Sequence, residues 1–100
     1  MSIPVAIPLA PFPFQVVSVQ LGSQPCRLEI FQKATGLFIN VYVSDVAIVL
    51  GAACLNAVFI VRDIYRGFLG DLVFADTQGN SDPDYTGLGG RFSLLWVAPS

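Results

Sequence analysis

The chain contains no histidine and few charged residues. Histidine is the commonest general base and the commonest transition-metal ligand, so its absence removes the usual way of activating a serine, threonine or cysteine nucleophile. Charged residues make up only 12% of the chain, about half the usual share of roughly 25%. We therefore expect that the protein is not an enzyme and that it holds no metal and no cofactor.

Clustered basic residues are also lacking. The five Lys and Arg residues are scattered and the net charge is −2, whereas a nucleic-acid interface needs basic residues gathered on one face. Apolar residues make up 54% of the chain, and the few charges cannot coat the surface of so small a domain. We expect a membrane, further copies of the chain or other subunits to cover the apolar remainder.

Only two cysteines are present, Cys26 and Cys54, and they form neither a CxxC motif nor a metal-binding set. The favoured interpretation is two small buried thiols, and the alternative is a disulfide between them. The first residues are not typical of a signal peptide, because they lack a basic segment and because prolines interrupt the apolar run.

Residues 1–13 contain four prolines among apolar side chains. Proline lacks a backbone donor and favours extended geometry, which excludes a helix or a central strand. Ile7, Leu9 and Phe12 are too apolar for a solvated linker. The sequence therefore predicts an extended arm that lies along its own domain or along a neighbour, with a frayed terminus as the alternative.

Alternating apolar and polar residues predict three consecutive strands over residues 14–21, 26–33 and 37–44. Four-residue turns join them, which is typical of an antiparallel meander. Two more strands, residues 72–76 and 92–97, flank a polar loop, and Phe92, Leu94 and Trp96 share one face of the last of them. Residues 62–71, between the meander and this pair, are expected to form charged surface turns.

Residues 46–61 are ambiguous, since Asn56 is the only strongly polar residue among them. The favoured interpretation is two short buried strands, residues 47–50 and 57–61, with a bend between them. A membrane helix is the alternative, but sixteen helical residues rise only about 24 Å, short of a hydrocarbon core of about 30 Å. The overall prediction is one all-β domain, residues 14–100, built as a small antiparallel barrel or sandwich of six to seven strands with the arm 1–13.

The polar loop, residues 76–91, reads DTQGNSDPDYTGLGGR. Its Gly, Pro, Asp and Asn content specifies tight turns. Asp76, Asp82 and Asp84 raise the alternative of a calcium or ligand site, but their spacing does not fit an EF-hand, and we expect them to cap turns. Tyr85 is predicted either to anchor a contact or to fold back on its own domain. Arg91 is expected to tether the loop by pairing with Asp84 or Asp76.

A family resemblance rests on this loop and on weaker matches elsewhere. The pattern comprises Ile7-Pro8-Leu9, the strand start at Phe14-Gln15, Arg27-Leu28, the Gly67…Gly70-Asp71-Leu72 turn, Asp76-Thr77-Gln78-Gly79, the run from Asp82 to Gly89, Arg91-Phe92 and the closing Leu94-Leu95-Trp96-Val97. It resembles the small baseplate plug proteins of contractile-tailed bacteriophages, a family typified by a cyanophage baseplate plug.

The resemblance implies a structural virion protein without catalysis, assembled in the host cytoplasm and carried in the tail baseplate. Such a subunit closes the channel of the baseplate hub until the sheath contracts. Its implied partners are other baseplate hub and tail-tube proteins, the tape-measure protein and further copies of itself, with neither nucleic acid nor membrane required. Contact roles are assigned to the arm and the loop, through Ile7, Leu9, Phe12, Asp76, Asp82, Asp84, Tyr85 and Arg91.

Overall fold

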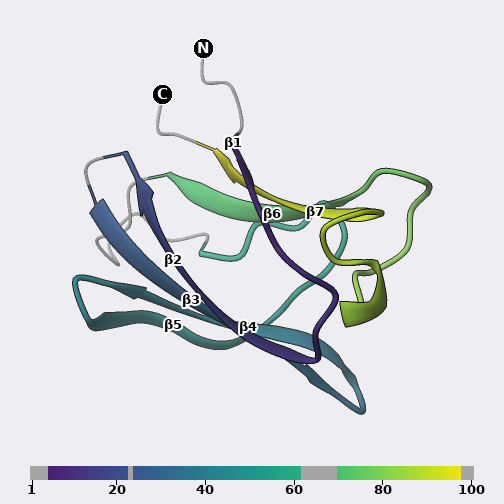
Figure 1. The fold of residues 1–100 in the computed structure, drawn as a ribbon, viewed down its shortest axis with the longest axis horizontal. Helices are drawn as coiled ribbons and strands as arrows, with labels where there is room; N and C mark the ends of the chain where they lie inside the picture. The colour runs from purple at the N-terminus through teal and green to yellow at the C-terminus, as the bar shows by residue number, and fades with distance from the viewer. Residues whose placement is uncertain (1–4, 23, 62–69, 98–100) are drawn as a thin grey trace.

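A computed structural model describes residues 5–22, 24–61 and 70–97. These residues form a sandwich of two antiparallel sheets, as predicted (Figure 1). The larger sheet has the order β2-β3-β4-β5 and the smaller has the order β1-β7-β6. The strands are β1 (Val5–Ile7), β2 (Phe14–Leu21), β3 (Gln24–Lys33), β4 (Gly36–Val43), β5 (Val46–Ala53), β6 (Asp71–Asp76) and β7 (Phe92–Val97), and a short 3-10 helix spans Tyr85–Gly87.

The larger sheet is the predicted meander. β2 has the predicted bounds and pairs with β3 without interruption from Phe14↔Phe31 to Leu21↔Gln24. β3 begins two residues earlier than expected, and β4 has the expected length but lies one residue earlier in the chain, so that only Ala34 and Thr35 remain in the turn between them. The apolar residues of the alternating pattern face the other sheet, since Leu28, Ile30, Ile39 and Val41 are fully buried.

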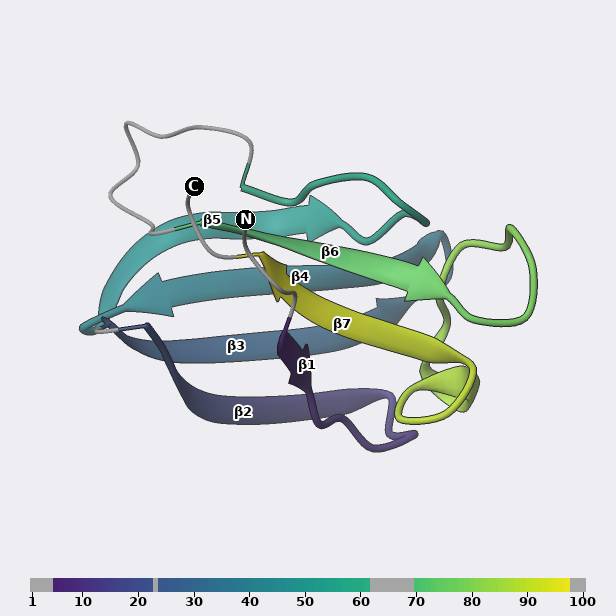
Figure 2. The same cartoon turned by 90° about the horizontal axis from the view of Figure 1, so that it is seen from above.

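The smaller sheet covers the inner face of the larger one (Figure 2). β6 and β7 contribute Leu72, Phe74 and Leu94, all with no exposed surface. Phe92 and Trp96 share a face with Leu94, as predicted, and are also buried. Burying a side chain of this size stabilises the fold by about 1.5–3 kcal/mol. The alternation of apolar and polar residues in the sequence therefore reflects the packing of the apolar residues between the two sheets.

The arm contributes an edge strand to the smaller sheet. β1 pairs with β7 through Val5↔Trp96, Ala6↔Leu95 and Ile7↔Leu94. Its three residues lie between prolines in the sequence, and an edge position suits such a segment because proline cannot donate to a ladder. The arm thus lies along its own domain over these residues. The division into an arm, 1–13, and a domain, 14–100, stays a prediction.

The expectation of two short buried strands in residues 46–61 is wrong. β5 is a longer strand at the edge of the larger sheet, and Val46 and Leu50 on it are 61% and 64% exposed. It continues through Gly51, which adopts a positive φ of 67°, and its register with β4 shifts twice. An edge strand buries only part of its side chains, which composition alone cannot reveal.

The second expected strand, residues 57–61, is replaced by isolated bridges beside β6. These are Asn56↔Phe74 and Phe59↔Val73, and Ala57 between them has a positive φ of 60°. The membrane-helix alternative for residues 46–61 fails, because the first eight of them form β5. Over the described ranges, no helix is long and apolar enough to span a bilayer. The turns expected in residues 62–69 lie outside the described residues.

Candidate interaction surface

The loop between β6 and β7 is closed at its base by Arg91 and Asp76. The Nε of Arg91 donates to Oδ1 of Asp76 and its Nη2 donates to Oδ2, both at 2.8 Å. The geometry follows from the sheet register, which places Asp76 opposite Phe92 at the ends of the two strands. Arg91 therefore does tether the loop, and Asp76 is its partner rather than Asp84.

The carboxylate of Asp76 also binds backbone groups within the loop. It accepts hydrogen bonds from the backbone N–H of Gln78 at 2.9 Å and of Ser81 at 2.8 Å, and the side chain has no exposed surface. The bonds from Arg91, followed by those from Ser81 and Gln78, hold the pKa of Asp76 well below its usual range. The bond to Asp76 likewise raises the pKa of Arg91. The pair is thus charged at neutral pH.

The middle of the loop is fixed to the segment that follows β5. Asp82 accepts a hydrogen bond of 3.0 Å from the backbone N–H of Asn56, and the side chain of Asn56 accepts one of 2.9 Å from the backbone N–H of Asp76. Pro83, next to Asp82, is buried. Asn56 therefore clamps both the base and the middle of the loop, and sequence reasoning gave it no such role.

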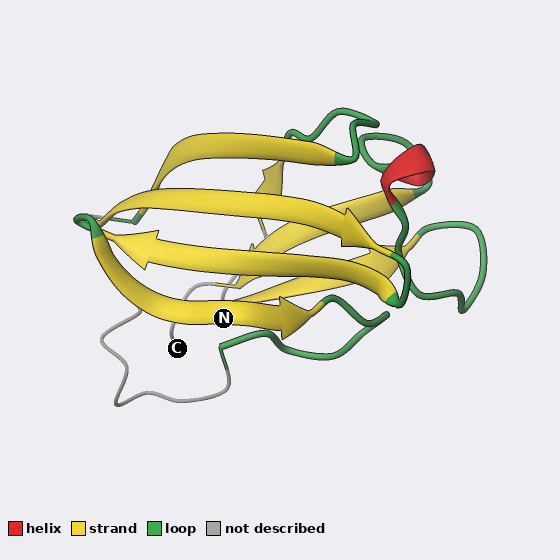
Figure 3. Cartoon of the chain, turned by 90° about the horizontal axis from the view of Figure 1, so that it is seen from below, coloured by secondary structure: helices red, strands yellow, loops and turns green. Residues whose placement is uncertain are grey.

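The far side of the loop is fixed to β3 through a short helix. Asp84 caps this 3-10 helix by accepting from the backbone N–H of Thr86 at 2.9 Å and from the Thr86 hydroxyl. The backbone N–H of Tyr85 donates to Oε1 of Gln32 at 3.1 Å. Tyr85 is half-buried against the core, so it folds back on its own domain. Figure 3 shows the helix at the same end of the sandwich as the loop.

The loop ends in close contact with the arm. Gly89 has a φ of 82°, and a Cβ added there would lie 2.2 Å from the carbonyl oxygen of Leu9. Beyond this contact the side chain of Gln15 bonds both backbone groups of Ala10, with Nε2 donating to its oxygen at 2.6 Å and Oε1 accepting from its nitrogen at 3.1 Å. Arm and loop therefore form one surface at this end of the molecule.

The predicted contact residues divide by exposure. Phe12 is 57% exposed, and Asp82 and Asp84 are exposed, so all three can reach a partner. Leu9, Tyr85 and Arg91 are half-buried. Ile7 is buried in the core of its own domain, and Asp76 has no exposed side-chain surface. The contact role of each of these residues stays a prediction.

Sequence reasoning missed a row of phenylalanines on the outer face of the larger sheet. Phe14, Phe31 and Phe38 are cross-strand neighbours, and the rings of Phe31 and Phe38 stack with centroids 6.1 Å apart. The ammonium of Lys33 lies 5.4 Å and 5.5 Å from these two ring centroids. Phe14 is 61% exposed. The alternation that places Val17 on the inner face of the sheet also places Phe14 on the outer face. This alternation could have predicted the row of phenylalanines from the sequence.

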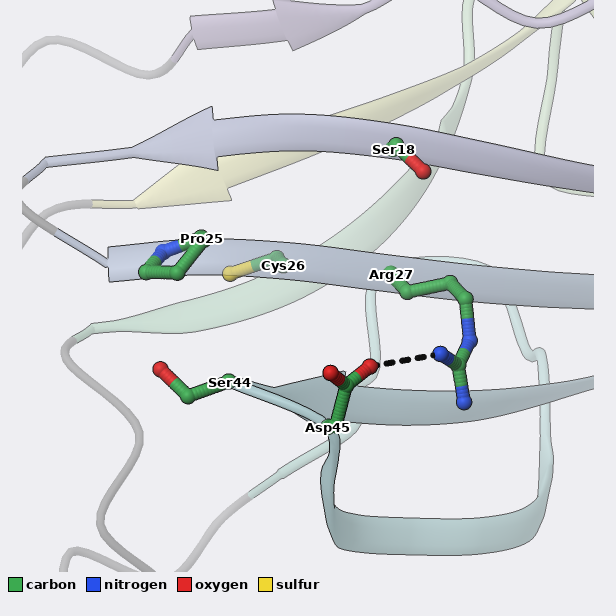
Figure 4. Close-up of a pocket in the computed structure, with 6 residues that line it drawn as sticks. All are labelled: Ser18, Pro25, Cys26, Arg27, Ser44 and Asp45. Atoms are coloured by element: carbon green, nitrogen blue, oxygen red, sulfur yellow. Dashed lines mark hydrogen bonds and ion pairs between the residues drawn. The ribbon is translucent and has the colours of Figure 1, made fainter.

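A shallow hollow of about 240 Å³ lies on the same larger sheet, lined by Ser18, Pro25, Cys26, Arg27, Ser44 and Asp45 (Figure 4). Its one cation is already engaged. Arg27 donates to Asp45 at 2.8 Å, lies 3.8 Å from Glu29 and sits 4.2 Å from the ring centroid of Tyr42. The hollow therefore offers no free charge to a ligand.

The described residues hold no group of three or more His, Cys, Asp or Glu side chains that could bind a metal ion. In the loop, the carboxylates that raised the calcium alternative are engaged as turn caps and tethers. Cys26 and Cys54 are free and buried, as favoured from the sequence.

Comparison with known protein families gives a match. A family model described as cyanophage baseplate Pam3 plug gp18 matches residues 5–99. A search of curated proteins finds no match. The match spans both sheets, the arm from β1 onward and the whole loop.

Proposed function

This chain belongs to the family of the cyanophage baseplate plug, and from that membership we propose that it is a plug subunit of a contractile tail. In this role it closes the channel of the baseplate hub until contraction, contacts hub, tail-tube and tape-measure proteins, and performs no catalysis. The family itself implies a virion protein that assembles with other baseplate components.

The observation that carries the proposal is the extent of the family match, which runs over residues 5–99 and so includes every described element. A match confined to one strand pair would reflect a shared fold. A match through the loop 76–91 also includes the residues whose hydrogen bonds fix the conformation of this loop, among them Asp76 and Arg91.

The exposed apolar side chains support an assembled state. Among the residues that the structure describes, eight large apolar side chains are at least 41% exposed: Val5, Phe12, Phe14, Val16, Val46, Leu50, Leu55 and Phe59. Single exposed apolar residues are ordinary on a monomer, whereas contiguous exposed apolar patches mark surfaces that a partner covers. We assign contacts with baseplate neighbours to the surface where arm and loop meet, through Phe12, Asp82 and Asp84.

The proposal is tested on phage particles that lack this chain. We expect particles without the protein to show an open hub channel by cryo-electron microscopy and to lose infectivity, and the wild-type protein supplied in trans to restore both. A closed channel and full infectivity without the chain would contradict the proposal.

Point variants supplied in the same way test the assigned surface. Phe12→Ala should reduce incorporation into particles, because it removes an exposed apolar contact. The control is Thr35→Ala, which shortens an exposed side chain in the turn between β3 and β4, away from the assigned surface. Equal incorporation of both variants would remove the surface from the proposal and leave the plug function standing.

A further inference from the structure

The outer edge of β2 is an open hydrogen-bonding edge. The backbone N–H of Gln32 donates to the carbonyl of Pro13 at 2.8 Å, and the antiparallel register continues from there through Gln15↔Ile30 and Val17↔Leu28. In such a ladder, alternate residues bond to the neighbouring strand. The odd-numbered residues of β2 therefore bond to β3. The even-numbered residues, from Phe14 to Gln20, direct their N–H and C=O groups away from it, and no other described strand pairs with them.

This edge carries none of the features that protect edge strands. Natural sheets shield their edges with charged residues, proline, bulges or very short strands. β2 has eight residues, FQVVSVQL, without a charge, a proline or a glycine, and its register with β3 has no break.

The other edge strands differ from β2. β5 contains Gly51 with a positive φ and two register shifts. β6 is bridged on its outer side by Asn56 and Phe59, and β1 has only three residues. Among the described strands, β2 alone presents a long, regular and uncharged edge.

We propose that β2 pairs with the β2 strand of a second copy of this chain, antiparallel across a two-fold axis, so that two four-stranded sheets become one of eight strands. Only even-numbered residues face the open edge, so the hydrogen-bonded pairs must join even to even. With Val17 opposite its own copy, Val16 faces Ser18 of the partner subunit and Phe14 faces Gln20 of the partner subunit. This register uses all the free backbone groups from Phe14 to Gln20 on both copies.

A copy of β2 is the occupant that the edge fits best. The strand is uncharged, so a charged partner strand would find no counter-charge on it, whereas a second β2 brings none. The nearest charged side chains, Arg27 and Glu29 of β3, are 3.8 Å apart from each other, and Arg27 also bonds Asp45. Pairing would cover Phe14 and Val16, which are 61% and 48% exposed. It would also place the half-buried Val17 beside Val17 of the partner subunit on the inner face of the joined sheet.

The test measures the mass of the purified chain by sedimentation velocity. We expect a dimer for the wild type. Val16→Lys with Ser18→Lys places lysines opposite one another across the axis and should weaken the dimer about tenfold or more. Val16→Glu with Ser18→Glu should do the same. Both positions are exposed on the outer face, so neither pair of changes disturbs the core.

Mixing the two variants supplies the decisive result. Each lysine then meets a glutamate, and we expect the mixed dimer to form. The matched control is Ala34→Lys with Thr35→Lys, which adds the same charge to the exposed turn between β3 and β4 and should leave the dimer intact. Folding of each variant is checked by circular dichroism.

A monomeric wild type at about 100 µM, where a Kd of about 10 µM would give mostly dimer, overturns the pairing. So does a lysine variant that dimerises like the wild type, or a mixture that fails to recover the dimer. The pairing and the plug function fail separately. A monomer that still enters baseplates refutes only the pairing, and a dimer absent from baseplates refutes only the plug function.

Discussion

Arg91 and Asp76 are joined by two parallel hydrogen bonds of 2.8 Å that close the loop between β6 and β7. The planar guanidinium matches the two carboxylate oxygens, and such paired bonds fix orientation as well as distance. Because the same carboxylate also holds two backbone N–H groups, the shape of the loop depends on the ionised form of one residue.

Stability should therefore fall in acid. The pKa of Asp76 is lower in the folded chain than the value of about 3.9 in an unfolded chain. The unfolded state then binds more protons in this range, so the contribution of Asp76 is fully present above about pH 5 and is lost as the pH falls through its folded pKa. Urea unfolding at a series of pH values measures this.

The Asp76→Asn variant provides the comparison. It should be less stable at pH 7 and should show a shallower loss of stability between about pH 5 and pH 2. Asp45→Asn is the control, because the Asp45 side chain is 87% exposed and its pair with Arg27 lies at the surface, where such pairs contribute about 0–1 kcal/mol. An Asp76→Asn profile parallel to that of the wild type would contradict the assignment.

Two glycines with similar backbone angles should respond differently to substitution. Gly89 and Gly51 have φ values of 82° and 67°, so alanine is strained at either position, by about 1–2 kcal/mol. Nothing lies within 4 Å of a Cβ at Gly51, whereas a Cβ at Gly89 meets the carbonyl of Leu9 at 2.2 Å. We expect Gly89→Ala to cost at least about 1 kcal/mol more than Gly51→Ala.

Urea unfolding of both variants measures the difference. Equal losses would mean that the arm does not pack on the loop through this contact. Limited proteolysis adds a second readout, because a displaced arm should be cleaved near Leu9 in Gly89→Ala and not in Gly51→Ala.

Regular alternation made most of the fold predictable. β2 and β7 begin and end where the sequence placed them, because polar and apolar residues alternate over Val17–Leu21 of β2 and turn-forming glycines lie near both strands. β5 lacks this contrast, since nearly all its residues are apolar. Whether such a strand is buried depends on its place in the sheet, and that place is fixed by pairing rather than by composition.

The candidate surface was predictable only in outline. The sequence indicated that Arg91 pairs with an aspartate of the loop, but the choice of Asp76 over Asp84 follows from the register of β6 and β7. The clamp by Asn56 joins residues 26 positions apart, Asn56 and Asp82. No local sequence pattern predicts this hydrogen bond, because it depends on where the segment after β5 lies relative to the loop in the folded chain.

The exposed outer side of β5 leads to a direct comparison of two leucines. Leu28 has no exposed surface and lies in the core, whereas Leu50 is 64% exposed. Leu28→Ala should cost about 2–5 kcal/mol of unfolding free energy, because it removes buried surface and leaves a cavity. Leu50→Ala should change stability by no more than about 0.5 kcal/mol.

Denaturant unfolding of the two variants measures both values. A large loss of stability for Leu50→Ala would mean that the Leu50 side chain is buried, as the expectation of a buried strand over residues 47–50 requires. The comparison is informative because the two substitutions remove the same atoms from the same residue type.

The two thiols should be unreactive in the folded chain. Burial raises the pKa of Cys54 to about 12 and also raises the pKa of Cys26. The thiolate is the reactive form, so at pH 8 the folded protein should be alkylated by iodoacetamide more than about 100-fold slower than the unfolded protein. Mass spectrometry counts the labels added over time.

The same measurement decides between free thiols and a disulfide. Unfolded in guanidinium without a reductant, the chain should gain two labels, since both cysteines are free. A chain that gains none until a reductant is added would carry a Cys26–Cys54 disulfide and would contradict the structure. Rapid labelling of the folded chain at one site would instead mean that the sandwich opens locally around that cysteine, because a buried thiol can react only when solvent reaches it.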